Sequence, residues 1–128
     1  MKKPEDLGEI KVEDIRWLKR AMKVFRIKKL GLKWSDSTLS YPDIWVIFNY
    51  NYPDIVVTHE WARQGVDERR KRLIHEILHV KGLRHGNYGK YQYSTIPEYD
   101  KYSEMIYNDM RGVIEGREPF RKFEKKPD

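Results

Sequence analysis

The sequence predicts an α+β fold in a single domain, 1–128, with a small antiparallel or mixed β-sheet and three helices. Two stretches, 11–30 and 98–115, carry apolar residues at spacings of three and four, the pattern of a helix with one buried face. Two short runs rich in β-branched and aromatic residues, 44–48 and 55–59, predict strands. A chain of 128 residues suits one modest core, which we place in about 11–115.

The first predicted helix spans 11–30 and should cover one face of the sheet. Its apolar residues would form one buried stripe: Val12, Ile15, Leu18, Met22 and Phe25. Gly31 follows and is expected to end this N-terminal helix. A short strand over 31–34 and a turn over 35–38 come next.

The strands 44–48 and 55–59 are separated by a polar, proline-containing stretch, which predicts an antiparallel hairpin. A peptide substrate would pair with a free sheet edge, and we expect 55–59 to offer that edge because it comes just before the next helix. His59 ends this predicted strand and has two interpretations. It is either a residue of the active-site rim or an ordinary surface strand residue.

The second predicted helix spans 67–81, with Asp67 as its N-cap. Its apolar residues form a stripe that can bury one face: Leu73, Ile74, Ile77 and Leu78. An irregular loop rich in Gly and Tyr follows, over 86–97, and leads into the last helix, which Gly116 can end. The tail, 117–128, reads as an extended segment outside the core.

The most informative stretch of the chain, 75–85, reads H-E-x-x-H-x-x-G-x-x-H. Residues four apart on a helix project from one face, so His75 and His79 can bind one metal ion. Gly82 can adopt the left-handed conformation that ends a helix, after which the chain can turn back and supply His85 as a third ligand. Three protein ligands with one open position are typical of a catalytic zinc site.

The chemistry that this motif predicts is the hydrolysis of a peptide bond with Zn²⁺ as cofactor. Neutral imidazole suits Zn²⁺, and H-E-x-x-H on a helix is associated with metalloproteases. Glu76 would take a proton from the attacking water as general base and pass it to the leaving amine as general acid. Tyr88, Tyr91 and Tyr93, in the loop after the motif, are candidates for stabilising the oxyanion, and the sequence does not choose among them.

Composition limits the other functions that the chain can have. There is no cysteine, so disulfides and thiolate metal ligands are excluded. The net charge of +6 suits an anionic partner, but acidic residues are interleaved with the basic ones, and we interpret the densest basic block, 69–72, as a solvated helix surface. A nucleic acid is therefore not the expected partner. No apolar run is long enough to span a membrane and no signal peptide is recognisable, which predicts a cytoplasmic protein.

The order of helix, small sheet, motif helix, second helix and tail resembles the minigluzincins, which are very small soluble prokaryotic metallopeptidases. The H-E-x-x-H-x(5)-H spacing of 75–85 is also similar to that of the SprT-like proteases. The resemblance covers about 11–115, although only 75–85 is specific. It implies a zincin-like fold and a zinc endopeptidase acting on a peptide or an unfolded protein, with the general base and the metal ligands at Glu76, His75, His79 and His85.

The resemblance has two further implications. In minigluzincins the C-terminal segment can occupy the cleft and keep the enzyme latent, a role that 118–123 could take here. In thermolysin-like metallopeptidases the third ligand is a Glu on a later helix, so Glu104 is the alternative to His85. The shorter spacing to His85 is the more specific signal.

Two other functions are compatible with the motif. The chain could be a catalytically inactive zinc-containing binding module for a nucleic acid or a protein, which the basic block 69–72 would support. It could also be a zinc hydrolase whose substrate is not a peptide. The presence of Glu76 favours catalysis, because a purely structural zinc site does not use that carboxylate.

Overall fold

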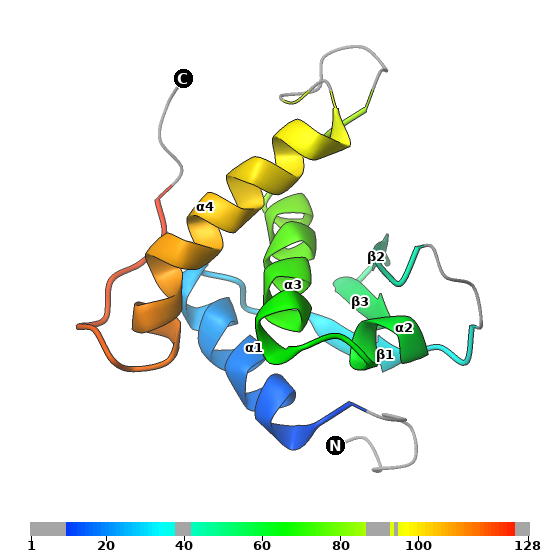
Figure 1. Cartoon of the computed structure of the whole chain (residues 1–128), viewed down its shortest axis with the longest axis horizontal. Helices are drawn as coiled ribbons and strands as arrows, with labels where there is room; N and C mark the ends of the chain where they lie inside the picture. Colours follow the sequence, from blue (N-terminus) through cyan, green and yellow to red (C-terminus); the bar gives the residue numbers. More distant parts are fainter. Residues whose placement is uncertain (1–9, 38–41, 87–92, 94, 125–128) are drawn as a thin grey trace.

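A three-stranded mixed sheet and four helices make up the α+β fold of the computed structural model, which describes residues 10–37, 42–86, 93 and 95–124 (Figure 1). The strands are β1 (Gly31–Trp34), β2 (Ile44–Phe48) and β3 (Pro53–Val57). The helices are α1 (Val12–Val24), the short α2 (His59–Ala62), α3 (Val66–Val80) and α4 (Ile96–Ile114). None of the helices described is both long and apolar enough to cross a bilayer.

β3 is the central strand of the sheet, in the order β1-β3-β2. β2 and β3 form the predicted antiparallel hairpin, with Val46 opposite Ile55, and β1 pairs with β3 in parallel. The prediction of 55–59 as an edge strand is therefore wrong in two respects, because the strand begins and ends two residues earlier and has a neighbour on each side. Its last three residues are buried, as expected for a central strand.

His59 belongs to a helix, so its interpretation as a surface strand residue is wrong. Thr58 precedes α2, and its Oγ1 donates a hydrogen bond of 2.8 Å to the carbonyl oxygen of Asp43. This bond fixes the turn from β3 into α2, because it ties the end of β3 to the residue before β2.

α1 ends six residues before the predicted boundary, because Arg26 adopts the left-handed conformation with φ 58°. The Ile27 N–H then bonds to the Met22 carbonyl at 2.8 Å, and the Arg26 N–H bonds to the Lys23 carbonyl at 3.3 Å. This pair of bonds is the Schellman arrangement that closes many helices, usually with Gly at the left-handed position. The predicted stop, Gly31, is instead the first residue of β1.

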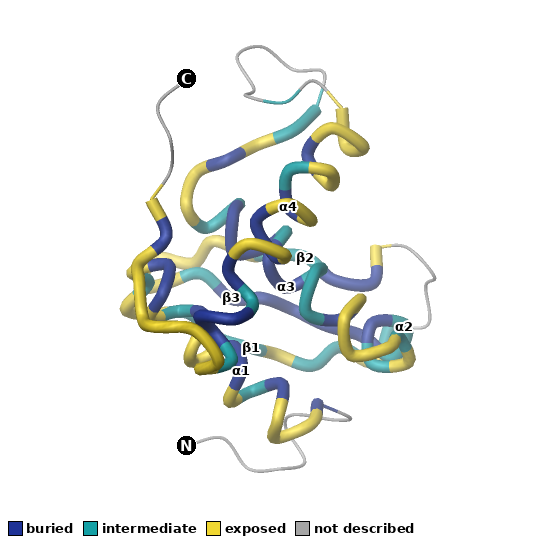
Figure 2. Tube along the Cα trace, turned by 60° about the vertical axis from the view of Figure 1, so that its left-hand side comes forward, coloured by how far each residue is buried: buried dark blue, intermediate teal, exposed yellow. Residues whose placement is uncertain are grey.

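α3 is the element that links the sheet to the other helices: it packs against β2 and β3 and also against α4 (Figure 1). Much of α3 and of β3 is buried, as Figure 2 shows. The sequence predicted that α1 would cover one face of the sheet. In the structure α3 packs on the sheet, and α1 makes its main helix contacts with α4. α3 begins at Val66 after Gly65, so Asp67 is not the N-cap; its carboxylate accepts a 2.7 Å hydrogen bond from the hydroxyl of Tyr107 on α4.

The basic block 69–72 is not a solvated surface, contrary to the prediction. Arg69 is 5% exposed, and its Nε donates to the buried Asp14 carboxylate of α1 at 2.8 Å. Arg72 pairs with Asp43 at 2.9 Å. These charges are largely neutralised within the fold, so the block gives no support to a nucleic-acid surface.

The described part of the tail packs on the domain, although the prediction placed it outside the core. Phe123 is 9% exposed, its ring lies 4.8 Å from that of Phe25, and its N–H bonds to the Val24 carbonyl at 2.8 Å. Arg121 pairs with Asp109 of α4 at 3.0 Å. None of the described tail residues lines the cavity discussed below, so their position gives no support to a tail that occupies it.

Candidate metal centre

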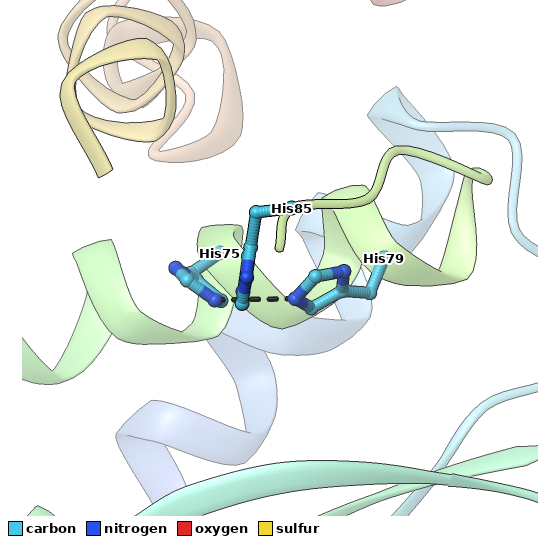
Figure 3. A group of neighbouring side chains, drawn as sticks. All are labelled: His75, His79 and His85. Atoms are coloured by element: carbon cyan, nitrogen blue, oxygen red, sulfur yellow. Dashed lines mark hydrogen bonds between the residues drawn. The ribbon is translucent and has the colours of Figure 1, made fainter. Parts of the chain in front are cut away.

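The three histidines of the motif come together as predicted. His75 and His79 lie one turn apart on α3, and His85 follows the helix (Figure 3). One ligand atom of each ring lies within 4.8 Å of those of the other two, so the three residues are close enough to hold one metal ion. All three side chains are partly buried.

The turn after α3 is what returns His85 to the helix face. Gly82 has φ 97°, as the sequence predicted, and its N–H bonds to the His79 carbonyl at 2.9 Å. The Leu83 N–H bonds to the Leu78 carbonyl at 3.0 Å, and the Leu83 side chain is buried with 1% exposure. These contacts form a Schellman ending that reverses the chain immediately before the third histidine.

The hydrogen bonds of the rings decide which nitrogen atoms are available. His75 Nδ1 lies 2.8 Å from Asp100 Oδ1, and His79 Nδ1 lies 2.9 Å from the Leu83 carbonyl oxygen. Both partners are acceptors, so each neutral ring carries its proton on Nδ1 and has a lone pair on Nε2. The two Nε2 atoms face each other at 3.2 Å, as the dashed line in Figure 3 shows.

Two lone pairs at this separation repel each other, and a cation shared between them removes the repulsion. Nitrogen ligands at about 2.0–2.1 Å from a tetrahedral zinc ion lie about 3.3–3.4 Å apart, close to the observed arrangement. The rings of His75 and His79 are also kept in the neutral form that binds metals. Burial and the neighbouring His79 lower the pKa of His75 to about 4, and burial lowers the pKa of His79. The donor set therefore fits a zinc ion.

Glu76 lies beside the histidines with 5% of its surface exposed. Its Oε2 is buried and makes no hydrogen bond to the described part of the chain. Burial, together with the carboxylates of Asp43 and Asp100, raises the pKa of Glu76 to about 8. A nearby cation would favour its ionised form, so this carboxyl also fits a metal site.

The histidines and Glu76 open into a cavity of about 540 Å³. One wall is formed by β2, through Ile44, Trp45 and Val46. Glu104 also lines the cavity, but its carboxylate lies 3.3 Å from Lys71 Nζ and is not in the ligand group. The geometry therefore supports His85 over Glu104 as the third ligand.

The sequence also predicted three tyrosines as candidates for the oxyanion site and His59 as a candidate for the active-site rim. Tyr88 and Tyr91 lie outside the described residues. Tyr93 is described: its backbone bridges to His85 and its ring lies 5.7 Å from that of Tyr99. His59 does not line the cavity, which disagrees with its placement at the rim.

Two residues of α4, Tyr99 and Asp100, contact the histidines of the candidate site. Tyr99 lies in the stretch 98–115, which the sequence predicts as a helix with one buried face, and neither Tyr99 nor Asp100 was predicted to belong to the site. A rule was available for the acid, because a metal-binding His commonly donates its second ring N–H to a carboxylate. The rule does not say which of the chain's many acids takes the role, since that depends on how α4 crosses α3.

Comparisons of this chain with models of protein families, with curated proteins and with solved structures found no match.

Proposed function

We propose that this chain is a zinc-dependent endopeptidase. The observation that carries the proposal is the pair of Nε2 lone pairs of His75 and His79, which face each other beside His85 and Glu76. Such a set of three imidazoles and a neighbouring carboxyl is the arrangement of a catalytic zinc site with one open position.

The roles of the residues follow from their positions. His75, His79 and His85 would hold the ion, which when bound supplies Lewis acidity to a water molecule and to the substrate carbonyl. Glu76 accepts the proton of the attacking water on its free carboxylate oxygen and then donates it to the leaving amine. Asp100 and the Leu83 carbonyl hold two of the rings in the required tautomer.

The substrate class is supported by the strand that forms the cavity wall. Among the described strands β2 pairs only with β3, so its other edge is available to an extended peptide. Backbone pairing along an edge accepts many sequences, which suits a peptide or an unfolded protein. The edge proposed for substrate is thus β2, in place of the strand chosen from the sequence.

The proposal is tested by measuring the zinc content of the purified protein and its cleavage of casein, with and without a chelator. We expect one zinc per chain and cleavage that the chelator abolishes. Glu76→Gln should keep zinc and lose about 10²–10⁴-fold in turnover, since this is the usual contribution of a general base. His79→Ala should lose both zinc and activity.

Three results would each contradict a different part of the proposal. A wild-type protein that binds no zinc when zinc is supplied would contradict the metal site. A zinc-loaded protein that cleaves no peptide would contradict the peptidase assignment and leave the metal site standing. Full activity in Glu76→Gln would contradict the role of Glu76 alone.

A further inference from the structure

We infer that Tyr99 is the floor of the metal centre, a positioning residue whose ring sets the relative orientation of the three histidine rings. The inference rests on the metal site of the proposed function and deepens it. It assigns to a residue of α4 a part in a site whose ligands all come from α3 and the turn after it.

The first support is ring packing. The centroid of the Tyr99 ring lies 4.5 Å from that of His75, 4.6 Å from that of His79 and 4.9 Å from that of His85. The ring stacks on His79 with an interplanar angle of 18° and meets His85 edge-on at 75°. Tyr99 itself is fully buried. One rigid side chain therefore contacts all three ligand rings at once.

The second support is the hydroxyl group of Tyr99. It donates a hydrogen bond of 2.9 Å to the backbone carbonyl of His75, the first ligand. The next residue, Asp100, bonds to the His75 ring. Two consecutive residues of α4 thus bind the backbone and the ring of the same histidine. The Tyr99 ring therefore cannot move relative to His75 without breaking these hydrogen bonds.

His85, the third proposed ligand, depends most on packing against Tyr99. His85 lies outside regular helix, and an isolated backbone bridge joins it to Tyr93. The Tyr93 ring meets Tyr99 edge-on, at 5.7 Å and 86°. Tyr99 therefore supports His85 directly and also supports the residue that holds its backbone. A smaller side chain at 99 would leave the His85 ring free to adopt other rotamers.

The chain provides a matched control in Tyr107, two turns further along α4. Both tyrosines are fully buried, and both donate their hydroxyl to an acceptor on α3: Tyr99 to the His75 carbonyl and Tyr107 to Asp67. Tyr107 packs against Trp17, and its ring is not among the described rings that contact the three histidines. Replacing Tyr107 therefore measures the general effect of losing a buried tyrosine from this interface.

The experiment compares Tyr99→Leu, Tyr99→Phe and Tyr107→Leu by zinc affinity, from competition with a chromophoric chelator, and by the visible absorption of the cobalt-substituted protein. Tyr99→Leu should weaken zinc binding about 10–100-fold and change the cobalt spectrum, as the loss of an outer support of a metal site does. Tyr99→Phe keeps the aromatic ring, so its zinc affinity and its cobalt spectrum should be close to those of the wild type. Tyr107→Leu should lower the melting temperature without changing either.

A second measurement needs no metal. In the metal-free protein, nitrogen NMR should show defined Nδ1–H tautomers for the His75 and His79 rings in the wild type and in Tyr99→Phe, and averaged signals in Tyr99→Leu. If the wild type binds no zinc, the proposed function fails, and this measurement still decides the role of Tyr99. If Tyr99→Leu does not fold, Tyr99→Met takes its place.

Two results would overturn the inference. One is a folded Tyr99→Leu protein with wild-type zinc affinity, cobalt spectrum and histidine signals. The other is an equal loss of zinc affinity in Tyr107→Leu, which would mean that any weakening of the α3–α4 interface has the same effect.

Discussion

At the scale of single residues, the acid–base behaviour of Glu76 departs strongly from that of a free glutamate side chain. Its pKa is raised from 4.5 to about 8, first by burial and then by the nearby carboxylates of Asp43 and Asp100. Arg72 pairs with Asp43 and so offsets one of these two charges. The metal-free protein therefore keeps a proton on Glu76 near neutral pH.

This proton predicts a pH dependence of stability in the metal-free protein. The folded chain holds the proton up to about pH 8, whereas the unfolded chain releases it above about pH 4.5, so stability falls as the pH rises between these values. The lowered pKa values of His75 and His79 act in the opposite direction, but mainly below pH 6.5. Between pH 6.5 and 8 we expect Glu76 to reduce the free energy of unfolding by about 2 kcal/mol.

The measurement is urea denaturation in the presence of a chelator at several pH values, for the wild type and for Glu76→Gln. The amide has a similar shape and does not titrate, so the other ionisable groups cancel in the difference. The stability of the wild type should fall relative to the variant over this interval. Parallel curves would show that Glu76 has an ordinary pKa.

At the scale of elements, three helices end in the same way. Each has a residue at positive φ followed by the pair of backbone bonds of a Schellman ending: Arg26 after α1, Gly82 after α3 and Gly116 after α4. Only the ending at Gly82 has a part in the candidate site. It supplies both the turn to His85 and the Leu83 carbonyl that orients His79.

Gly82→Ala is predicted to weaken both the fold and the metal site. A side chain at φ 97° strains the backbone, which costs about 1–2 kcal/mol, even though no atom of the described residues lies within 4 Å of the added carbon. Relief of the strain would move the Leu83 carbonyl and His85, so we expect zinc affinity to fall at least about tenfold.

Gly116→Ala is the matched control, because Gly116 has φ 79° and ends α4 in the same type of turn. It should lower the melting temperature by a similar amount and leave zinc affinity unchanged. The two variants are compared by thermal denaturation and zinc titration. A zinc affinity of wild-type strength in Gly82→Ala would contradict the role assigned to this turn.

The elements also show how far the sequence determines the structure. The hairpin, α3, α4 and the stops at Gly82 and Gly116 follow from patterns within a few residues, and they were predicted to within two residues. The end of α1 was missed because an arginine occupies the left-handed position that glycine usually takes. The position of β3 in the sheet was missed because strand order depends on contacts between distant segments.

The same distinction applies to the candidate site. Its three histidines and Glu76 belong to one local pattern, 75–85, from which their proximity could be predicted. Tyr99 and Asp100 are brought to the histidines only by the packing of α4 on α3, which no local pattern encodes. The inward orientation of Arg69 was missed for the same reason, since its partner, Asp14, lies 55 positions away.

At the scale of the whole molecule, the tail contributes to the core through Phe123. Phe123→Ala should lower the free energy of unfolding by about 2–4 kcal/mol, because it removes a buried aromatic ring packed on Phe25. Phe120 lies three positions earlier and is 52% exposed, and its ring lies 5.3 Å from the Lys23 ammonium. Phe120→Ala should cost less than about 1 kcal/mol.

Thermal denaturation of the two variants tests this difference, with a change in melting temperature of about 3–5 °C for each kcal/mol in a chain of this size. Equal melting temperatures would mean that the tail is not part of the cooperative unit. The result also guides any truncation, because deleting the chain after Gly116 removes a core residue as well as a tail.

The sequence positions of the three proposed ligands have a consequence for the synthesis of the protein. His75, His79 and His85 are separated by intervals of four and six residues, so little chain entropy is lost when they are brought together. During synthesis they leave the ribosome before Tyr99 and Asp100. If the proposed metal site is occupied during synthesis, the three histidines would therefore bind the ion first, and the later packing of α4 would fix its position.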